Sequence, residues 1–587
     1  MTSLRAARAW LKRHLCFIGP GLVAAVAYVD PGNWATDLQA GAEYGYKLLF
    51  IVFVAGVAAV ILQILSVRLG AVTSQSLPQQ TRALFLRWEA KWPKYRRLLR
   101  LGLWTLWALA EIAIIATDLA ELLGSAIALN LLFPRLPLWA GVLITAVDVL
   151  VVLLFFRSNS GRQGMMFFEI VIVSLVLAVF VSFAILLHLI KPEWREVFLG
   201  LVPSKTLFKP GALYLGVGII GATVMPHALF LGSSLATVDR LGMLPVPPSR
   251  KPKRRNVALP ALNVFGLRRR NQQQERAATP DNVELAELPS VAAAGPSTLA
   301  VVAADVAPLP KNASDPAPAD ADDKDDDFAA AQKRYEREVR AFDRIDWVRL
   351  HVNHASVDTI YSLFGFALTI NSAILTLAGA AFYYSTTGAD KSDASLFGAH
   401  ALLKDYIGNG AAIIFALALL CAGQSASITA TLAGQIVSEG FLEWRTSPFV
   451  RRLITRLIGV IPATVVAIAV GPKGMDDMLV ASQVILSIVL PTVTVPLVYL
   501  CSQESVMGVD GPVEERPLAQ VDRTVSPESP DAVPTPAPSN TDDDSAPPRR
   551  RRSFTSPKWL TGIGYLLCFV VILANGYVIV ELALGNG

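Results

Sequence analysis

The sequence predicts an all-α membrane protein in which two inverted repeats of five transmembrane helices are followed by an additional eleventh helix. Three observations lead to this fold class: an apolar composition, a series of apolar runs of membrane-spanning length, and matching interruptions in two of those runs. Of the 587 residues, 53% are hydrophobic and only 17% are charged. A soluble chain needs more charge than this to cover its surface, so the bilayer is the expected solvent.

Apolar runs long enough to cross the hydrocarbon core, roughly 17 to 25 residues each, can be counted about eleven times. Several carry Gly, Pro or an acidic residue in mid-run, which costs backbone hydrogen bonds or desolvation unless the position faces protein or a water-filled cavity. Helices that break around a central site are therefore expected. The runs cover residues 15–43, 48–70, 100–132, 137–156, 165–190, 210–237, 357–385, 405–433, 452–471, 477–501 and 558–583.

Two polar inserts separate the spans and give the chain its expected organisation. Both are rich in Pro, Ala, Asp or Ser and cannot bury enough apolar surface to offset the entropy lost on ordering, so both are expected to be disordered. We interpret them as solvated cytosolic tethers; the alternative is a platform for cytosolic regulatory or trafficking proteins. In order, the expected segments are a cytosolic N-terminus over 1–14, the first repeat over 15–190, an external loop and span six over 191–240, the first insert over 241–340, spans seven to ten over 341–501, the second insert over 502–557, and span eleven with the C-terminus over 558–587.

Basic residues between the runs predict the orientation. The N-terminus, the 71–99 loop and the 440–452 loop, which includes Arg451, are rich in Lys and Arg and fall on one side if the spans alternate. The positive-inside rule makes that side the cytosol, although the opposite 191–209 loop also carries basic residues. We expect a multi-pass protein of the plasma membrane or of an endosomal or vacuolar membrane, with no nucleic-acid partner.

The first interruption is the segment Ala27-Tyr-Val-Asp30-Pro31-Gly32-Asn33. Pro31 removes an amide donor and Gly32 loosens the chain, so the helix is expected to unwind and expose carbonyls such as that of Ala27. A carboxylate and a carboxamide beside free carbonyls make an oxygen-rich cation site. The structural alternative is that Pro31 merely kinks a packing helix and that Asp30 pairs with a buried cation, but the nearby spans offer no Lys or Arg.

The second interruption, Ala222-Thr-Val-Met225-Pro226-His227, stands at the equivalent place of the second repeat. Gly21 precedes Asp30 by nine residues, and a second glycine precedes Met225 by the same distance. A lone Met in an apolar helix is usually core filler. Its correspondence with Asp30 is what makes Met225 a candidate metal ligand, beside the imidazole of His227.

With these two motifs, the sequence resembles the Nramp family of proton-coupled divalent metal ion transporters, which have the LeuT-like fold, and in its second motif the yeast-type branch. A DPGN segment and an MPH segment in one membrane chain are a specific signal. After MPH, however, Ala228 and Gly232 stand where many relatives have Asn and a second His. The matching segments are GPGLVAAVAYVDPGNWATDLQAG (19–41), EIAIIATDLAELLGSAIALNLL (111–132), GATVMPHALFLGSSL (221–235), LCAGQSASITATLAGQIVSEGFL (420–442) and SQVILSIVLP (482–491).

The resemblance implies import of Mn2+ or Fe2+ with protons, by alternating access and without a permanently bound cofactor. It further implies that the metal is coordinated by Asp30, Asn33 and Met225, by the backbone carbonyl of Ala27 or Ala222 and, in some states, by Gln483.

The resemblance also implies a proton route through His227 and the third-span acids Glu111, Asp118 and Glu121. Spacings of seven and three residues place these acids along one side of a helix. Three acids on one membrane helix favour a hydrated path. Structural hydrogen bonding to neighbouring helices is the alternative.

Other functions fit the residues less well. A Mg2+-carrying relative would gain little from the soft sulfur of Met225, and a sodium-coupled amino-acid symporter would not place Asp30 where a substrate carboxylate binds. A metal sensor or receptor with the transporter fold would have no need of the third-span acids. An enzyme is disfavoured because the sequence lacks a nucleophile paired with a base, a P-loop and an HExxH motif.

Overall fold

The computed structural model describes residues 14, 20–155, 161–245, 322–384, 395–443, 448–513 and 549–584. The chain divides into two compact units, one made of Met1–Leu244 and Ala341–Gly587 and the other of Pro245–Arg340. All the expected membrane runs belong to the first unit. Apart from Pro245, the described part of the second unit belongs to the helix α12 (Asp322–Ala341).

The first half of the larger unit is helical, and several of its helices begin at a Pro or Gly residue. The helices of this half are α2 (Pro20–Val26), α3 (Pro31–Tyr44), α4 (Leu49–Thr73), α5 (Leu77–Lys91), α6 (Arg96–Leu132), α7 (Leu138–Phe155), α8 (Gly161–Ile190), α9 (Trp194–Leu199), α10 (Pro210–Thr223) and α11 (Pro226–Leu235), with 3-10 turns at Gly45–Leu48, Pro93–Tyr95 and Lys205–Phe208.

The second half adds further helices and one small antiparallel sheet of two strands, β1 and β2. Its elements are α13 (Arg344–Ser362), α14 (Thr369–Ala378) between π-helical turns at Leu363–Leu368 and Gly379–Tyr383, α15 (Leu396–Tyr406), α16 (Asn409–Leu442), α17 (Pro448–Ala469), α18 (Pro472–Ser502), α19 (Glu504–Met507), β1 (Gly508–Val513), β2 (Arg549–Ser553) and α20 (Lys558–Ala583).

In the part of the chain that the structure describes, each of the eleven expected apolar runs contains helix. Within the described residues, eight helical stretches are long and apolar enough to cross a membrane, and Leu138–Val147 and Leu453–Ala469 are shorter apolar helices. Together these ten stretches contain residues of all eleven expected runs, because Pro31–Thr73 holds the end of the first run and the whole of the second run. The helix that contains the start of the seventh expected run begins before residue 357. Helix α13 starts at Arg344, where the Asp343 side chain accepts hydrogen bonds from two backbone amides of the first turn.

The described edges of the two inserts contain regular secondary structure. Helix α12 lies in the 241–340 insert, and its sequence begins with acidic and ends with basic residues, an order that favours the helix dipole. In the 502–557 insert, β1 pairs with β2, and the amide of Ser556 donates to the carbonyl of Cys501 at 2.9 Å, which ties the end of the insert to α18. Residues 246–321 and 514–548 lie outside the described part of the chain.

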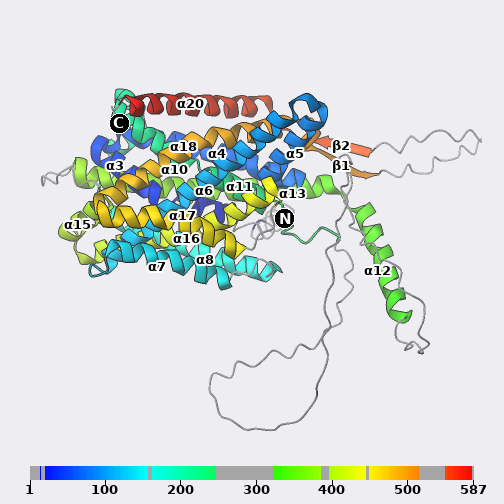
Figure 1. Ribbon diagram of the computed structural model, residues 1–587, viewed down its shortest axis with the longest axis horizontal. Helices are drawn as coiled ribbons and strands as arrows, with labels where there is room; N and C mark the ends of the chain where they lie inside the picture. The colour runs from blue at the N-terminus through cyan, green and yellow to red at the C-terminus, as the bar shows by residue number, and fades with distance from the viewer. Residues whose placement is uncertain are drawn as a thin grey trace, which may run out of the picture. The chain divides into compact units, whose positions relative to one another are not determined.

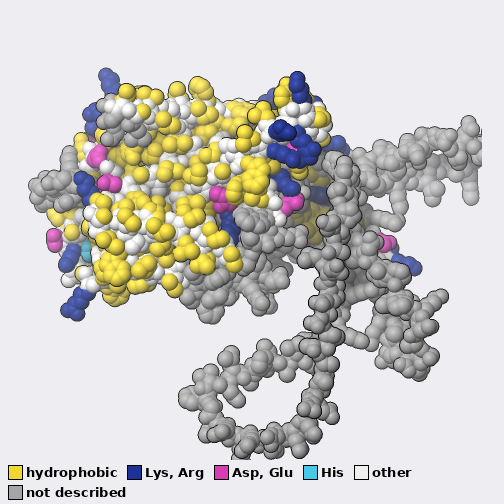
Figure 2. Space-filling model, in the orientation of Figure 1, with side chains coloured by type: hydrophobic (Ala, Val, Ile, Leu, Met, Phe, Trp, Pro, Cys, Tyr) yellow, Lys and Arg dark blue, Asp and Glu magenta, His cyan; other side chains and the backbone are white. Residues whose placement is uncertain are grey.

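The helices of the larger unit pack alongside one another (Figure 1). Helices α3, α6, α10, α16 and α18 form much of the interior; α20 packs on α10 and α18, whereas α7 and α8 cover α6, α16 and α17. Figure 2 shows that apolar side chains cover most of the visible surface of these helices, with charged side chains gathered near their ends. On α20, for example, Leu566, Phe569 and Leu573 are at least 60% exposed, as expected for a lipid-facing helix.

Helix α2 is short, yet it is completely enclosed by protein. Its apolar residues from Leu22 to Val26 are all buried. It packs against α8, α11, α13 and α16. At its start, the backbone amide of Gly21 donates to a carboxylate oxygen of Asp358 in α13 at 2.7 Å. The half of the first span that precedes the break is therefore tied to the seventh span.

Gly124 of α6 lies so close to the ring of Pro31 that an added Cβ would overlap it. Because the proline ring is rigid, Gly124→Ala should push α3 away from α6 and cost about 1 to 3 kcal/mol of stability, as overpacking usually does. We expect a lower melting temperature of the purified protein in detergent. Gly562→Ala in α20 is the matched control, since an added Cβ meets nothing within 4 Å there; equal melting of both variants would contradict the tight contact.

Candidate metal site

Asp30 lies in the gap between α2 and α3 and caps the start of α3. Its carboxylate is completely buried and accepts hydrogen bonds from the amides of Gly32 at 3.2 Å and Asn33 at 3.1 Å, and from the Asn33 side chain at 2.6 Å. Pro31 occupies the first helical position, where an amide donor is not needed. The local sequence thus holds a carboxylate at the positive end of a helix dipole.

The two breaks of the chain meet through Asn33. Its side-chain amide, besides bonding Asp30, donates to the backbone carbonyl of Ala222 at 2.8 Å. Ala222 is buried near the end of α10, just before the second break. The two interruptions that the sequence analysis paired by their spacing are therefore in direct contact.

Met225 has the same structural position in the second break as Asp30 in the first. Each is the cap residue that precedes a proline at the start of a helix, α11 or α3. Met225 is completely buried, and so is Ala27 in the first break. This equivalence agrees with the expected repeat.

Gln483 of α18 lies against the first break. A Cβ placed on Gly32 would overlap the Gln483 side-chain amide, so only glycine leaves room for this approach. The Gln483 nitrogen donates to Ser482 at 3.0 Å, whereas its oxygen has no hydrogen-bond partner among the described residues. That oxygen is available as a ligand.

Asn371 of α14 lies beside these residues and was not predicted from the sequence. Its side-chain nitrogen donates to the carbonyl of Tyr28 at 2.9 Å and to the side-chain oxygen of Asn33 at 3.2 Å. It therefore supports both the unwound backbone and a candidate ligand. A carboxamide in the middle of an apolar run was the signal that could have found it.

His227 lies in the first turn of α11 and points toward α6. It is completely buried, and its Nδ1 atom lies 3.4 Å from the hydroxyl of Thr117. Its Nε2 atom has no hydrogen-bond partner among the described residues. The contact joins the second break to the helix that carries the three acids.

Glu111 and Asp118 of α6 form ion pairs with arginines of α17, which were not among the site residues predicted from the sequence. Glu111 accepts from Arg451 at 2.7 and 2.8 Å. Asp118 lies 3.1 Å from Arg456, and both side chains are nearly inaccessible, at 0% and 3% exposure. The expected loop position of Arg451 is thus wrong, because α17 begins at Pro448. Glu121 is buried on the same helix.

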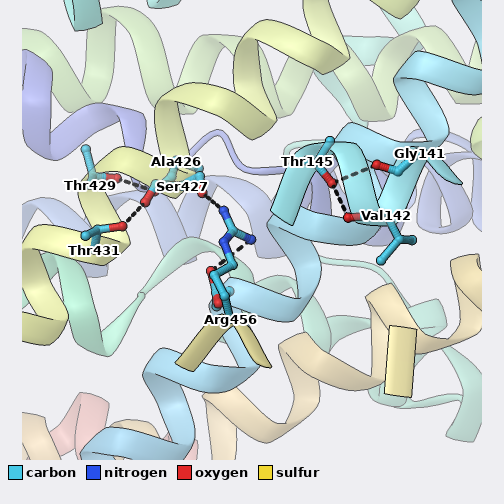
Figure 3. A network of polar contacts seen from close by, with 9 residues as sticks. Gly141, Val142, Thr145, Ala426, Ser427, Thr429, Thr431 and Arg456 are labelled. Atoms are coloured by element: carbon cyan, nitrogen blue, oxygen red, sulfur yellow. Dashed lines mark hydrogen bonds and ion pairs between the residues drawn. The ribbon is translucent and has the colours of Figure 1, made fainter. Parts of the chain in front are cut away.

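The arginine of the inner pair also reaches α16. Figure 3 shows the Arg456 guanidinium directed at the hydroxyl of Ser427, to which it donates a hydrogen bond. Around it, Thr431 and Thr429 donate to the backbone carbonyls of Ser427 and Ala426, each at 2.8 Å. Glu111 and Asp118 are therefore each in an ion pair with α17, and Arg456 joins α17 to α16 as well.

The candidate donors around the breaks are a carboxylate, two carboxamides, backbone carbonyls and a thioether. This mixture suits a borderline divalent ion such as Mn2+ or Fe2+ better than Zn2+, which prefers Cys and His. Within the described residues, no three His, Cys, Asp or Glu side chains come together to hold a metal.

A cavity of about 550 Å3 opens beside the outer part of α3. Its walls come from α3, α15 and the start of α18, and they include the acids Glu43, Asp476 and Asp477. On α3 the lining residues are Ala35, Gln39 and Glu43, all beyond Asn33 along the helix. Figure 1 shows α15, one of the helices that line the cavity, at one end of the bundle.

A sequence profile described as "Natural resistance-associated macrophage protein-like" matches residues 21–257 and 333–512. The chain belongs to the Nramp family. Among similar proteins, the manganese transporter pdt1 of Schizosaccharomyces pombe is 39% identical over 85% of this chain and 77% of its own length. The iron transporter SMF3 of Saccharomyces cerevisiae is 36% identical, over 85% of this chain and 84% of its own length.

The fold agrees with Nramp structures. A crystal structure of a mutant of the Eremococcus coleocola manganese transporter superposes with a TM-score of 0.62 at 25% identity, covering 96% of this chain and 86% of that one. The expected LeuT-like membrane fold is thereby confirmed. The names of the similar Nramp proteins describe transporters, in agreement with the expectation of a transporter and not an enzyme.

Proposed function

We propose that this chain carries divalent transition-metal ions, Mn2+ and Fe2+, into the cytosol together with protons. The observation that supports this most directly is the contact between the two breaks, where Asp30, Asn33 and the Ala222 carbonyl converge. Two helices unwound at one point, each with a helix start directed at it, form the kind of midplane site that alternating-access carriers use. The names of the similar transporters support the choice of metals.

In this proposal, Asp30 supplies the charge, and Asn33, the carbonyls of Ala27 or Ala222 and the Gln483 oxygen supply neutral ligands. Met225 adds a soft atom that favours transition metals over Ca2+ and Mg2+. Asp30 must be ionised to bind metal, so protons and metal compete for it.

The proton route would run from His227 to α6. The Thr117 contact of His227 places the imidazole against the helix that carries Glu111, Asp118 and Glu121. Arg451 and Arg456 form ion pairs with Glu111 and Asp118, so that a proton arriving at either acid has to weaken an ion pair. That coupling lets proton movement change the packing of α17 against α6.

The end of the bundle that carries α5 would face the cytosol, because the 71–99 segment is rich in Lys and Arg. The cavity beside α15 would then face the outside or a lumen. In this arrangement, metal enters from the acidic cavity, and the buried α2 closes the opposite side.

Uptake into liposomes that hold the purified full-length protein tests the function. Mn2+ and Fe2+ should enter faster when the outside is acidic, whereas Ca2+ and Mg2+ should enter poorly. Equal uptake with and without the pH gradient would remove proton coupling from the proposal. Preferential uptake of Mg2+ would favour a magnesium carrier, and metal binding without uptake would favour a sensor.

Met225→Ala should change selectivity more than rate. The variant leaves a shell of oxygen ligands, which bind Ca2+ well, while Mn2+ still finds a carboxylate and carbonyls. A difference of about 1.4 kcal/mol in the sulfur bond corresponds to a tenfold preference, so we expect roughly tenfold stronger inhibition of Mn2+ uptake by Ca2+. The measurement is Mn2+ uptake against rising Ca2+. If Ca2+ inhibits the variant and the wild type equally, Met225 only fills space.

A further inference from the structure

A basic and aromatic surface lies where α5 turns into α6, and the proposed transport cycle does not use it. Figure 2 shows Lys and Arg side chains gathered in the region where Figure 1 places α5. We refer to this surface as the basic corner. Its exposed side chains are Arg87, Lys91, Trp92, Lys94, Tyr95, Arg96, Arg97, Arg100 and Trp104.

The charge of the basic corner is strongly one-sided. Residues 77–104 contain seven Lys and Arg residues but a single acid, Glu89. Glu89 is engaged with two of the cations, Arg96 at 3.3 Å and Arg100 at 3.2 Å. Arg82 pairs with Glu443 outside this segment, and an external anion would stabilise the positive charge that remains.

Apolar and aromatic side chains connect the basic corner to the membrane-facing surface of α6. Trp92, Tyr95 and Trp104 are 44%, 52% and 53% exposed, and Leu101 is 63% exposed. Along α6, residues 97, 101, 104 and 108 are all exposed, and their helical spacing places them on one face of the helix. Arg97 therefore lies on the same face as Leu101 and Trp104. Arg97 lies about 10 Å from Trp104 along the helix axis.

This arrangement matches the boundary of a bilayer. Trp and Tyr concentrate at the level of lipid headgroups, and Lys and Arg extend from apolar surface toward phosphates. Lys91 lies over the ring of Trp92 at 5.0 Å, which places a cation and an interfacial ring side by side. A soluble acidic partner would not fit as well, because Leu101 and Trp104, on the same face of α6 as Arg97, are exposed apolar side chains that suit contact with acyl chains.

We propose that the basic corner binds the phosphate-bearing headgroups of anionic phospholipids in the leaflet that it faces. The guanidinium of Arg97 can hold a phosphate with two parallel hydrogen bonds, and Lys91 and Lys94 add charge. The site also connects to the transport helices, since the amide of Leu77 at the start of α5 donates to Ser233 of α11 at 2.9 Å. A bound headgroup thus steadies a helix that contacts α11.

The test compares the full-length wild type with the triple variant Lys91→Gln, Lys94→Gln, Arg97→Gln. Each protein is placed in bilayers containing spin-labelled phosphatidylserine or phosphatidylcholine, and the fraction of label held at the protein is measured. The wild type should select phosphatidylserine. Because each Lys or Arg near an anionic surface contributes about fivefold, the triple variant should lose at least about tenfold of this selectivity.

The matched control is Arg195→Gln, Lys205→Gln, Lys209→Gln, which removes three exposed cations from the opposite ends of the helices. That segment lies near Tyr46, before α4, whereas α5 follows α4. The control should keep wild-type selectivity. Equal loss in both triple variants, or no loss in the first, would overturn the proposal.

A second measurement needs no variant. The phosphatidylserine selectivity of the wild type should fall as salt is raised, because salt screens exposed charges; selectivity that ignores salt would overturn the proposal. So would a wild type that shows no lipid selectivity but binds a soluble polyglutamate peptide.

Discussion

Asp30→Asn is expected to abolish Mn2+ binding and uptake while the protein stays folded. Asn is as good a helix cap as Asp, so the start of α3 should survive the change. The side chain loses the charge that offsets the dehydration of a divalent ion, and the candidate donors that remain near it are neutral. The measurements are Mn2+ uptake in liposomes, Mn2+ binding by calorimetry and thermal melting of the purified variant.

The matched control is Asp405→Asn, which neutralises an exposed acid at the end of α15. It should transport like the wild type. If Asp30→Asn transports Mn2+ at the wild-type rate, Asp30 is only a helix cap, and the metal site must be sought elsewhere.

Arg456→Met is expected to destabilise the protein by about 3 to 5 kcal/mol, because it leaves the buried carboxylate of Asp118 without its ion-pair partner. The double variant Arg456→Met, Asp118→Asn should recover most of this loss, since neither charge remains. The measurement is the melting temperature or the urea midpoint in detergent for the wild type, both single variants and the double variant.

An exposed ion pair gives the control for this experiment. Arg349 and Asp346 lie 3.3 Å apart on α13, with side chains 44% and 59% exposed. Arg349→Met should therefore cost less than about 1 kcal/mol. If Arg456→Met costs no more than Arg349→Met, or if the double variant is no more stable than the single one, the buried pair does not have the assigned energetic role.

The broken helices could be predicted from the sequence because their cause is local. Proline at positions 31 and 226 cannot donate an amide hydrogen bond inside a helix, and the preceding residues cannot continue the helix easily. The structure places helix starts at these prolines. That the two breaks touch through Asn33 and Ala222 is a long-range fact, which the repeat suggested but did not require.

The ion pairs between the acids of α6 and the arginines of α17 could not be predicted from the local sequence. Charge alone identifies Glu111 and Asp118 as unusual in a membrane helix, but the choice between a hydrated path and an ion pair depends on which helix packs beside α6. Arg451 stands near a predicted span boundary, and a shift of a few residues moves it from a loop into α17. Asn371 was missed because a single carboxamide barely changes the hydropathy of its run.

The enclosed position of α2 has a consequence for the temperature dependence of transport. In the proposed cycle, metal leaves toward the cytosol only when α2 gives up its contacts with α13 and its bond to Asp358. Water then reaches the apolar side chains from Leu22 to Val26, and hydration of apolar surface raises the heat capacity. Wherever this opening limits turnover, the activation enthalpy changes with temperature, and an Arrhenius plot of metal flux curves instead of following a straight line.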